Sequence, residues 1–136
     1  MFSLSIALYY LAALGTIFMA ARYMFGSLPT PYHKEMMQRA EAPMPEILET
    51  ILRAHGRNLG AGLLASGVAI FLFTDMIEPG SNFVVRLRPV LVGLIIGVPI
   101  TVYTRRLEKD TGVHTPWRVS LGLLSVIVVG YGLSFL

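Results

Sequence analysis

The chain has 136 residues, of which 54% are hydrophobic and 14% are charged, and it carries a net charge of +3 at pH 7. A soluble domain has about 25% charged residues, and a disordered chain combines low hydrophobicity with high charge, so this composition argues against both classes. The chain has no cysteine, which excludes disulfides, thiolate zinc sites and iron–sulfur clusters.

Four uncharged apolar runs follow one another along the chain, at residues 2–21, 58–74, 89–104 and 119–136. A bilayer core of about 30 Å needs about 20 helical residues, and the flanking Arg57, Arg86 and Arg88 can snorkel to extend the two shorter middle runs. The alternating pattern of a membrane β-barrel is absent, and a helix satisfies its own backbone in lipid. The sequence therefore predicts an all-α membrane protein of one domain, a bundle of four transmembrane helices spanning about 2–21, 58–74, 85–104 and 117–136.

The segment between the first two runs, residues 22–57, is too long for a simple connection. After Pro45, Glu46 and Glu49 stand where carboxylates complement a helix dipole, and apolar residues recur with helical spacing at 47, 48, 51 and 52. We therefore expect a cytoplasmic amphipathic helix over about 45–55, between the first and second transmembrane helices. It either lies on the inner membrane surface, parting from the second span at Gly56, or extends that span.

Lys and Arg are unevenly divided among the connecting segments. Segment 22–57 contains five and segment 105–118 contains four, whereas segment 75–88 contains two and the N-terminal end none. By the positive-inside rule, the two basic segments are cytoplasmic and both termini lie outside. We therefore expect an integral protein of a bacterial inner membrane, with periplasmic termini. The positive charge then reflects topology and contact with the lipid bilayer, and no nucleic-acid partner is expected.

Small residues recur at the spacing that lets membrane helices approach closely. The second run contains Gly60, Ala61 and Ala65, and the third contains Gly93 and Gly97, a G-x-x-x-G pair. These residues predict either a docking face, for a membrane-protein partner or a second copy in a homo-oligomer, or packing within the chain's own bundle. Pro99, in the same run as the pair, predicts a bend in that helix.

None of the four apolar runs contains Asp, Glu, Lys, Arg or His. A proton-coupled transporter generally needs an ionisable group at membrane depth, so this class is disfavoured. His33, His55 and His114 fall in the connecting segments, where they cannot hold a b-type haem between spans, and no metal-ligand spacing is present. We therefore expect no metal site and no fixed cofactor.

Polar residues gather at the cytoplasmic ends of the second and third runs. The members of this candidate polar cluster are Glu49, Arg53, His55, Arg57, Asn58, Arg105 and Arg106. If the two groups converge, Arg53 and Arg106 can clamp an anionic headgroup or a small substrate, with His55 as acid or base. The alternative is a solvated collar of side chains that anchors the helices at the membrane interface.

Two short motifs carry a family resemblance. Residues 52–62, LRAHGRNLGAG, open a glycine-rich run, and a later run ends in Tyr103-Thr104-Arg105-Arg106 and is followed by Asp110-Thr111-Gly112. Over about residues 47–136 this order resembles the DoxX-like small four-helix membrane proteins. The resemblance implies a four-helix bundle and, in some relatives, association with quinone-linked redox complexes. Arg53-Ala54-His55 with Asn58 is also similar to membrane-bound glutathione-transferase-like proteins, although the Glu and Pro-Phe that follow in that family are missing here.

Three functions fit these features. The first is a non-catalytic accessory or structural subunit that packs against membrane partners or itself through the small-residue faces. The second is a membrane enzyme, or a protein that binds lipid or quinone, which uses the polar cluster at the cytoplasmic face. The third is a passive pore for small neutral solutes, for which no selectivity motif is present.

Overall fold

The computed structural model describes residues 1–136 and contains five α-helices and no strand, which confirms the all-helical fold. Three of the helices are long and apolar enough to cross a membrane, and another apolar helix is shorter, at 17 residues. In chain order the helices are α1 (Phe2–Phe25), α2 (Pro31–Arg39), α3 (Glu46–Asp75), α4 (Phe83–Thr111) and α5 (Trp117–Leu133).

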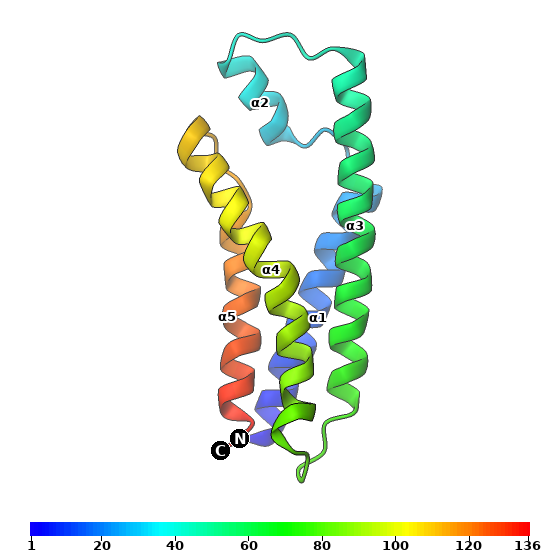
Figure 1. Ribbon diagram of the computed structural model, residues 1–136, viewed down its shortest axis with the longest axis vertical. Coiled ribbons are helices and arrows are strands. Elements are labelled where there is room, and N and C mark those ends of the chain that lie inside the picture. The colour runs from blue at the N-terminus through cyan, green and yellow to red at the C-terminus, as the bar shows by residue number, and fades with distance from the viewer.

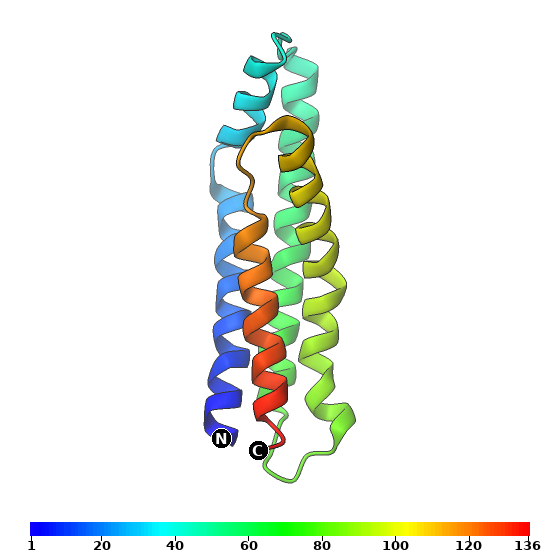
Figure 2. The same cartoon turned by 90° about the vertical axis from the view of Figure 1, so that its left-hand side faces the viewer.

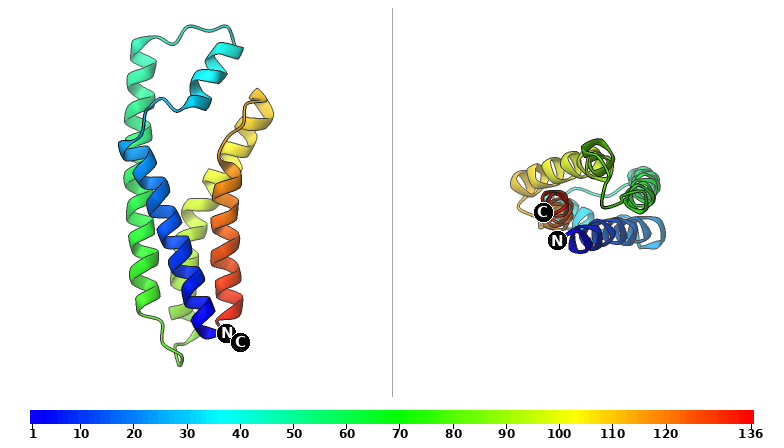
Figure 3. Two further views of the ribbon diagram at one scale, coloured as in Figure 1. Left: turned by 180° about the vertical axis from the view of Figure 1, so that it is seen from behind. Right: turned by 90° about the horizontal axis from the view of Figure 1, so that it is seen from below.

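The four longer helices run along the length of the molecule (Figure 1), and each packs on the next in the order α1, α3, α4, α5, with α5 also packing on α1. Both termini and the turn between α3 and α4 lie at one end of the bundle, as Figure 2 shows from the side. At the opposite end lie α2 and the turn between α4 and α5, which are also visible from behind in Figure 3. We call this opposite end the loop end; it carries both basic segments of the sequence.

Glycines allow α1 and α3 to pack closely. A Cβ atom placed at Gly67 would lie 2.6 Å from Cγ1 of Ile17 and 3.2 Å from the backbone oxygen of Ala13. One placed at Gly60 would lie 2.8 Å from Cγ of Met24. Only a residue without a side chain permits helices to approach this closely. α1 and α3 therefore form one helix pair.

The G-x-x-x-G residues bring α4 and α5 together in the same way. A Cβ atom at Gly93 would lie 3.0 Å from Cδ1 of Ile127, and one at Gly97 would lie 2.7 Å from Cδ2 of Leu124. Both glycines are buried inside the bundle. α4 and α5 therefore form the second helix pair, and this glycine face contacts the chain's own α5.

α4 bends in its middle, and its C-terminal half follows α5 away from α3 (Figure 1). Pro99 lies inside this helix and cannot donate the helical hydrogen bond to the preceding turn, which is the usual origin of such a bend. As a result, the α1–α3 pair and the α4–α5 pair diverge toward the loop end.

The region expected to form an amphipathic helix is helical and extends the second long helix, which is one of the two arrangements that the sequence left open. Residues 45–55 are not a separate element, because α3 begins at Glu46 and continues unbroken through Gly56. A glycine inside a helix costs about 1 kcal/mol, which packing against a neighbouring helix can offset. A further helix, α2, lies between the first two long helices, and the hydropathy of the sequence does not predict it. It begins at Pro31, a residue favoured at the first helical position.

Arg86, which is expected to snorkel, has its side chain buried against other parts of the chain. It is 9% exposed and donates hydrogen bonds to the carbonyl oxygens of Ser81 at 2.9 Å, of Pro79 at 2.7 Å, and of Ser134. These carbonyls belong to the α3–α4 turn and to the end of α5, where no helical donor reaches them. Arg86 therefore fastens the turn to the C-terminal end of the chain.

Candidate functional site

A cavity of about 300 Å³ lies between the two helix pairs, where they diverge. We call it the deep cavity. Of its 20 lining residues, 13 are hydrophobic. Ile70 and Ile127 line its inner end and belong to the buried core that also contains Tyr9, so the bundle is closed beyond them. The other large apolar side chains that line it are Met19, Leu59, Leu63, Ile96, Ile100, Leu123 and Leu124.

The threonine and serine hydroxyl groups in the wall of the deep cavity are bonded to the helices themselves, whereas the hydroxyls of three lining tyrosines, Tyr23, Tyr32 and Tyr103, are not. Thr16 and Thr104 each donate to the carbonyl oxygen four residues earlier in the same helix, at 2.8 and 2.6 Å. Ser120 donates to the carbonyl oxygen of Gly97 at 3.1 Å. Since each hydroxyl has only one hydrogen, none of the three is left to donate to a ligand in these positions. The deep cavity is therefore suited to an apolar group.

A second cavity, of about 320 Å³, lies at the loop end and differs in character from the first. We call it the mouth cavity. It shares Met19, Tyr23, Tyr32 and Pro116 with the deep cavity, so the two are adjacent. The other residues that line it are Arg22, Pro31, Glu35 and His114. An apolar space thus adjoins a polar one along the bundle.

The charges around the mouth cavity are unequally neutralised. Glu35 forms an ion pair with Arg39, with an oxygen–nitrogen distance of 2.7 Å. His114 is 88% exposed, and its Nδ1 lies 3.6 Å from Oε1 of Glu108. Arg22 takes part in none of the ion pairs of the chain and donates no side-chain hydrogen bond. The uncompensated charge at the mouth cavity is therefore the guanidinium group of Arg22.

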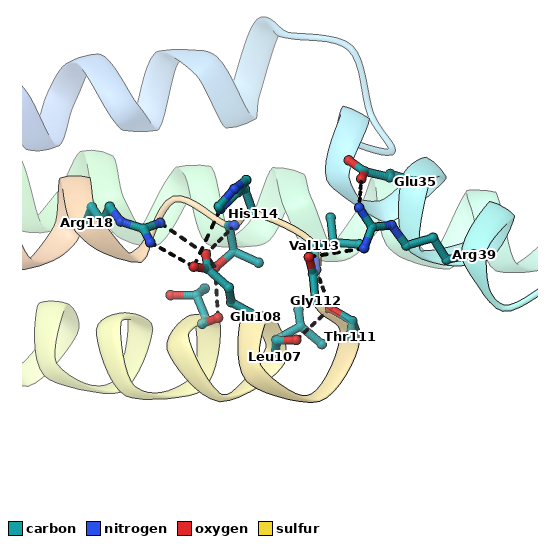
Figure 4. Close-up of polar contacts among 11 residues, drawn as sticks. Glu35, Arg39, Leu107, Glu108, Thr111, Gly112, Val113, His114 and Arg118 are labelled. Carbon is teal, nitrogen blue, oxygen red and sulfur yellow. Dashed lines mark hydrogen bonds and ion pairs between the residues drawn. The ribbon is translucent and has the colours of Figure 1, made fainter.

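Glu108 holds the α4–α5 turn that forms one side of the mouth cavity (Figure 4). Its carboxylate accepts a hydrogen bond from the backbone N–H of Thr115 at 2.8 Å and two from the guanidinium group of Arg118, at 2.9 and 3.3 Å. Glu108 follows the apolar run that ends at Thr104, so it lies outside the proposed span. The hydrogen bond from Thr115 and those from Arg118 lower the pKa of Glu108 to about 2. The turn is therefore held by a carboxylate that stays ionised.

α2 lies across the loop end and is attached loosely. None of its residues is buried, and one hydrogen bond joins it to the α4–α5 turn, from Arg39 Nη1 to the carbonyl oxygen of Gly112 at 3.2 Å (Figure 4). At the start of α2, Nδ1 of His33 lies 2.8 Å from the hydroxyl of Thr30, and partial burial lowers the pKa of His33. Tyr32 and Glu35 of this helix line the mouth cavity, so α2 covers it.

The α3 members of the candidate polar cluster interact with nearby groups. Glu49 and Arg53 form an ion pair at 2.8 Å, four residues apart on the same helix. Arg57 donates to the carbonyl oxygen of Tyr23 at 3.2 Å and so ties α3 to α1. None of the three lines either cavity.

The remaining members are exposed and are not joined to that group. The guanidinium carbon of Arg105 lies 5.3 Å from the ring centre of Trp117, on the α4–α5 pair. His55, Asn58 and Arg106 are exposed and have no side-chain hydrogen bond or ion pair. No polar contact joins the α3 residues to Arg105 or Arg106, because the two helix pairs have diverged at this level.

Among the small residues, the structure separates two groups. Gly60, Gly93 and Gly97 are buried against neighbouring helices of the same chain, as described above. Ala61 and Ala65 lie on the exposed face of α3. Of the five predicted small residues, these two alanines remain available to a partner.

The residues that line the mouth cavity were not predicted. Arg22 and Tyr23 mark the end of the first apolar run, which is a signal of a membrane boundary and not of a ligand site. Tyr32, Glu35 and His114 come from two different connecting segments, and only the folded chain brings those segments together.

No family model, no curated protein and no solved structure matches this chain. The resemblance to DoxX-like proteins thus stays a prediction. No group of three or more His, Asp or Glu side chains lies close enough together to hold a metal ion.

Proposed function

We propose that this chain is an integral membrane protein of four spans that binds one lipid-like molecule between its two helix pairs, without catalysing a reaction. The observation that carries the proposal is the adjacency of the deep cavity and the mouth cavity. The apolar deep cavity lies among the apolar runs and adjoins the polar mouth cavity at the loop end. An amphiphile that lies along the membrane normal has its apolar and polar parts in the same order. The volume of the deep cavity, about 300 Å³, is at the lower end of the range for small-molecule sites, which favours a ligand with a single hydrocarbon chain or ring.

The membrane topology is part of the proposal. α5 would be the fourth span: at 1.5 Å per residue its 17 residues extend over about 26 Å, close to the thickness of the hydrocarbon core. Trp117 begins α5 with Arg105 and Arg118 over its ring, at 5.3 and 4.6 Å, an arrangement typical of an interfacial anchor. We place the loop end in the cytoplasm and both termini in the periplasm, in a bacterial inner membrane.

Other interpretations of the sequence receive less support. For an accessory subunit, the G-x-x-x-G pair offers no docking face because Gly93 and Gly97 contact α5, which leaves the exposed Ala61 and Ala65 of α3 as the only members of the predicted set that could meet a partner. An enzyme that uses the polar cluster would need Arg53 and Arg106 to converge, yet no polar contact joins them. A passive pore would need an open path, whereas Tyr9, Ile70 and Ile127 fill the core beyond the deep cavity.

The test is to fill the cavity with a side chain. Thr16 lines the deep cavity, so Thr16→Phe places an aromatic ring there. The matched control is Leu14→Phe, because Leu14 lies two residues away on α1 and is 56% exposed. The purified proteins are placed in lipid nanodiscs with hexadecanol or hexadecanoic acid, and native mass spectrometry counts the probe molecules that remain bound.

We expect one bound probe on the unaltered protein and on Leu14→Phe, and none on Thr16→Phe. Each variant must keep the circular dichroism spectrum and the elution volume of the unaltered protein. Equal binding by Thr16→Phe and the unaltered protein would contradict the proposal, as would the absence of binding to both probes.

A further inference from the structure

We infer that the molecule bound in the two cavities is an anionic single-chain amphiphile, with its acidic group at Arg22 and its hydrocarbon chain in the deep cavity. This inference rests on the function proposed above. It specifies which end of the ligand lies where, and which charge it carries.

The polar end of the ligand has one place to lie. Inside the bundle, the hydroxyl hydrogens of Thr16, Thr104 and Ser120 are already donated to backbone carbonyls, so a polar group beside them would lose its hydrogen bonds to water without replacing them. The other hydroxyls of the deep cavity belong to Tyr23 and Tyr32, which also line the mouth cavity, and to Tyr103, which is 67% exposed. The mouth cavity contains a guanidinium group and lies at the end of the bundle where the apolar runs stop. The chain of the ligand must therefore point inward and its polar group toward the loop end.

The charge of the polar group follows from the residues that surround it. Glu35 is neutralised by Arg39, and the imidazole of His114 lies beside the carboxylate of Glu108, on its outer, solvent-exposed side. Arg22 has no anionic partner within the protein. An arginine at the boundary of an apolar site binds a carboxylate or phosphate through two parallel charge-assisted hydrogen bonds, which a neutral alcohol or quinone cannot match.

The number of hydrocarbon chains in the ligand follows from the volume of the deep cavity. The deep cavity, at about 300 Å³, is at the small end of ligand sites, and Leu63, Ile100 and Leu124 line it from three different helices. One alkyl chain fits this space better than the two chains of a phospholipid. A fatty acid, or another acidic molecule with one chain, combines this shape with the required charge.

The first experiment compares hexadecanoic acid with hexadecanol, which has the same chain without the charge. Binding to the protein in nanodiscs is measured at about pH 9, well above the ordinary pKa of a carboxyl group. We expect the acid to bind at least about tenfold more tightly than the alcohol, the ratio that corresponds to one charge-assisted hydrogen bond. An excess of sodium acetate should not displace it; displacement would show a site for small carboxylates and overturn the inference.

Arg22→Gln should abolish this preference while leaving the affinity for hexadecanol unchanged. The matched control is Arg106→Gln, since Arg106 is also exposed at the loop end and unpaired but lines neither cavity. Equal affinity of the unaltered protein for acid and alcohol would overturn the inference and leave the proposed function standing. Binding of neither would overturn the proposed function itself. An equal loss of preference in both variants would show a general surface charge effect, and would also overturn the inference.

A second measurement needs no change at Arg22. Trp117 is the only tryptophan of the chain and directly follows Pro116, which lines both cavities. Hexadecanoic acid brominated at carbon 2 should quench Trp117 fluorescence more than the same acid brominated at carbon 16, after subtraction of the quenching seen with Thr16→Phe. Stronger quenching by the acid brominated at carbon 16 would place the carboxylate in the deep cavity and overturn the inference.

Discussion

Arg39 donates a hydrogen bond from Nη1 to the carbonyl oxygen of Gly112 over 3.2 Å, and so joins α2 to the α4–α5 turn across the open end of the bundle. The same guanidinium group holds Glu35, one turn earlier on α2. No residue of α2 is fully buried, although Tyr32, His33, Met36 and Met37 are half-buried. The two contacts of Arg39 therefore add to a small packed surface in holding α2 in place. α2 therefore covers the mouth cavity, and little free energy is needed to move it away.

Arg39→Gln should release α2 from the α4–α5 turn. We expect amide hydrogen exchange over residues 31–39 to become faster, by roughly tenfold for one lost charge-assisted hydrogen bond, while exchange in α1 and α3 is unchanged. Mass spectrometry of peptides from the deuterated protein measures this directly.

The control for this prediction is Arg53→Gln. Arg53 pairs with Glu49 four residues earlier at 2.8 Å, just as Arg39 pairs with Glu35, but it forms no hydrogen bond or ion pair with another helix. Exposed pairs of this kind contribute about 0.5 kcal/mol or less. If both variants accelerated exchange in their own helix equally, the contact with Gly112 would have no special role.

Gly97→Leu should destabilise the bundle without changing its state of association. The added side chain would enter a space where even a Cβ atom lies 2.7 Å from Leu124, and overpacking of this kind costs about 1–3 kcal/mol. The midpoint of thermal unfolding in mild detergent should fall, and light scattering should report the same mass as before. Adding Leu124→Ala to Gly97→Leu should recover part of the loss.

Gly122→Ala serves as the control, because nothing lies within 4 Å of a Cβ atom at that position in α5. It should leave stability unchanged or raise it by up to about 1 kcal/mol. A drop in assembled mass with Gly97→Leu, at unchanged unfolding temperature, would instead favour the docking interpretation of the G-x-x-x-G pair.

The long helices follow from local features of the sequence, and the site does not. Hydropathy and the placement of Lys and Arg are properties of short segments, so they predict the apolar helices and group the two basic segments at one end. The site depends on the direction in which α4 bends at Pro99, and on which helix each glycine faces. Pro99 predicts a bend but not its direction, and Gly93 does not identify Ile127 as its neighbour. α2 is missed because its sequence is polar and its place depends on a contact with Gly112.

Glu108 should make stability depend on pH in the acidic range. Its pKa is about 2 in the folded chain, against an ordinary value of 4.5, because Thr115 and Arg118 donate hydrogen bonds to the ionised form. Since the folded pKa lies below the unfolded one, the stabilisation is fully present above about pH 4.5 and is lost as the pH falls toward 2. Glu108→Gln should therefore lower the unfolding midpoint at pH 7, and the difference from the unaltered protein should shrink at about pH 3.

Asp110→Asn is the matched control for Glu108, because Asp110 lies on the same helix, is exposed, and forms no ion pair. Its substitution should leave the unfolding midpoint unchanged at both pH values. A difference between Glu108→Gln and the unaltered protein that stayed constant down to about pH 3 would mean that the pKa of Glu108 is not linked to folding.

Arg86→Met should be among the most destabilising single changes at the end of the bundle that holds the termini. The arginine donates to three backbone carbonyls and lies near two aromatic rings, with its guanidinium carbon 6.0 Å from the ring centre of Phe2 and 5.4 Å from that of Phe135. Methionine keeps the apolar part of the side chain but leaves these carbonyls without a donor, and the one at Ser134 is buried, where an unpaired polar group costs about 1–3 kcal/mol. We expect a loss of about 3 kcal/mol in the free energy of unfolding, measured by denaturant titration in detergent.

The matched change is Arg88→Met, two residues further along α4, where the side chain is exposed and makes no hydrogen bond or ion pair. It should alter the free energy of unfolding by less than about 0.5 kcal/mol. Because no carboxylate pairs with Arg86, the effect of Arg86→Met should also be the same at pH 5 and pH 8, which separates it from an ion-pair mechanism. If Arg86→Met and Arg88→Met lowered the free energy of unfolding by similar amounts, Arg86 would act as a surface anchor, as the sequence suggests. It would then not fasten the α3–α4 turn to Ser134.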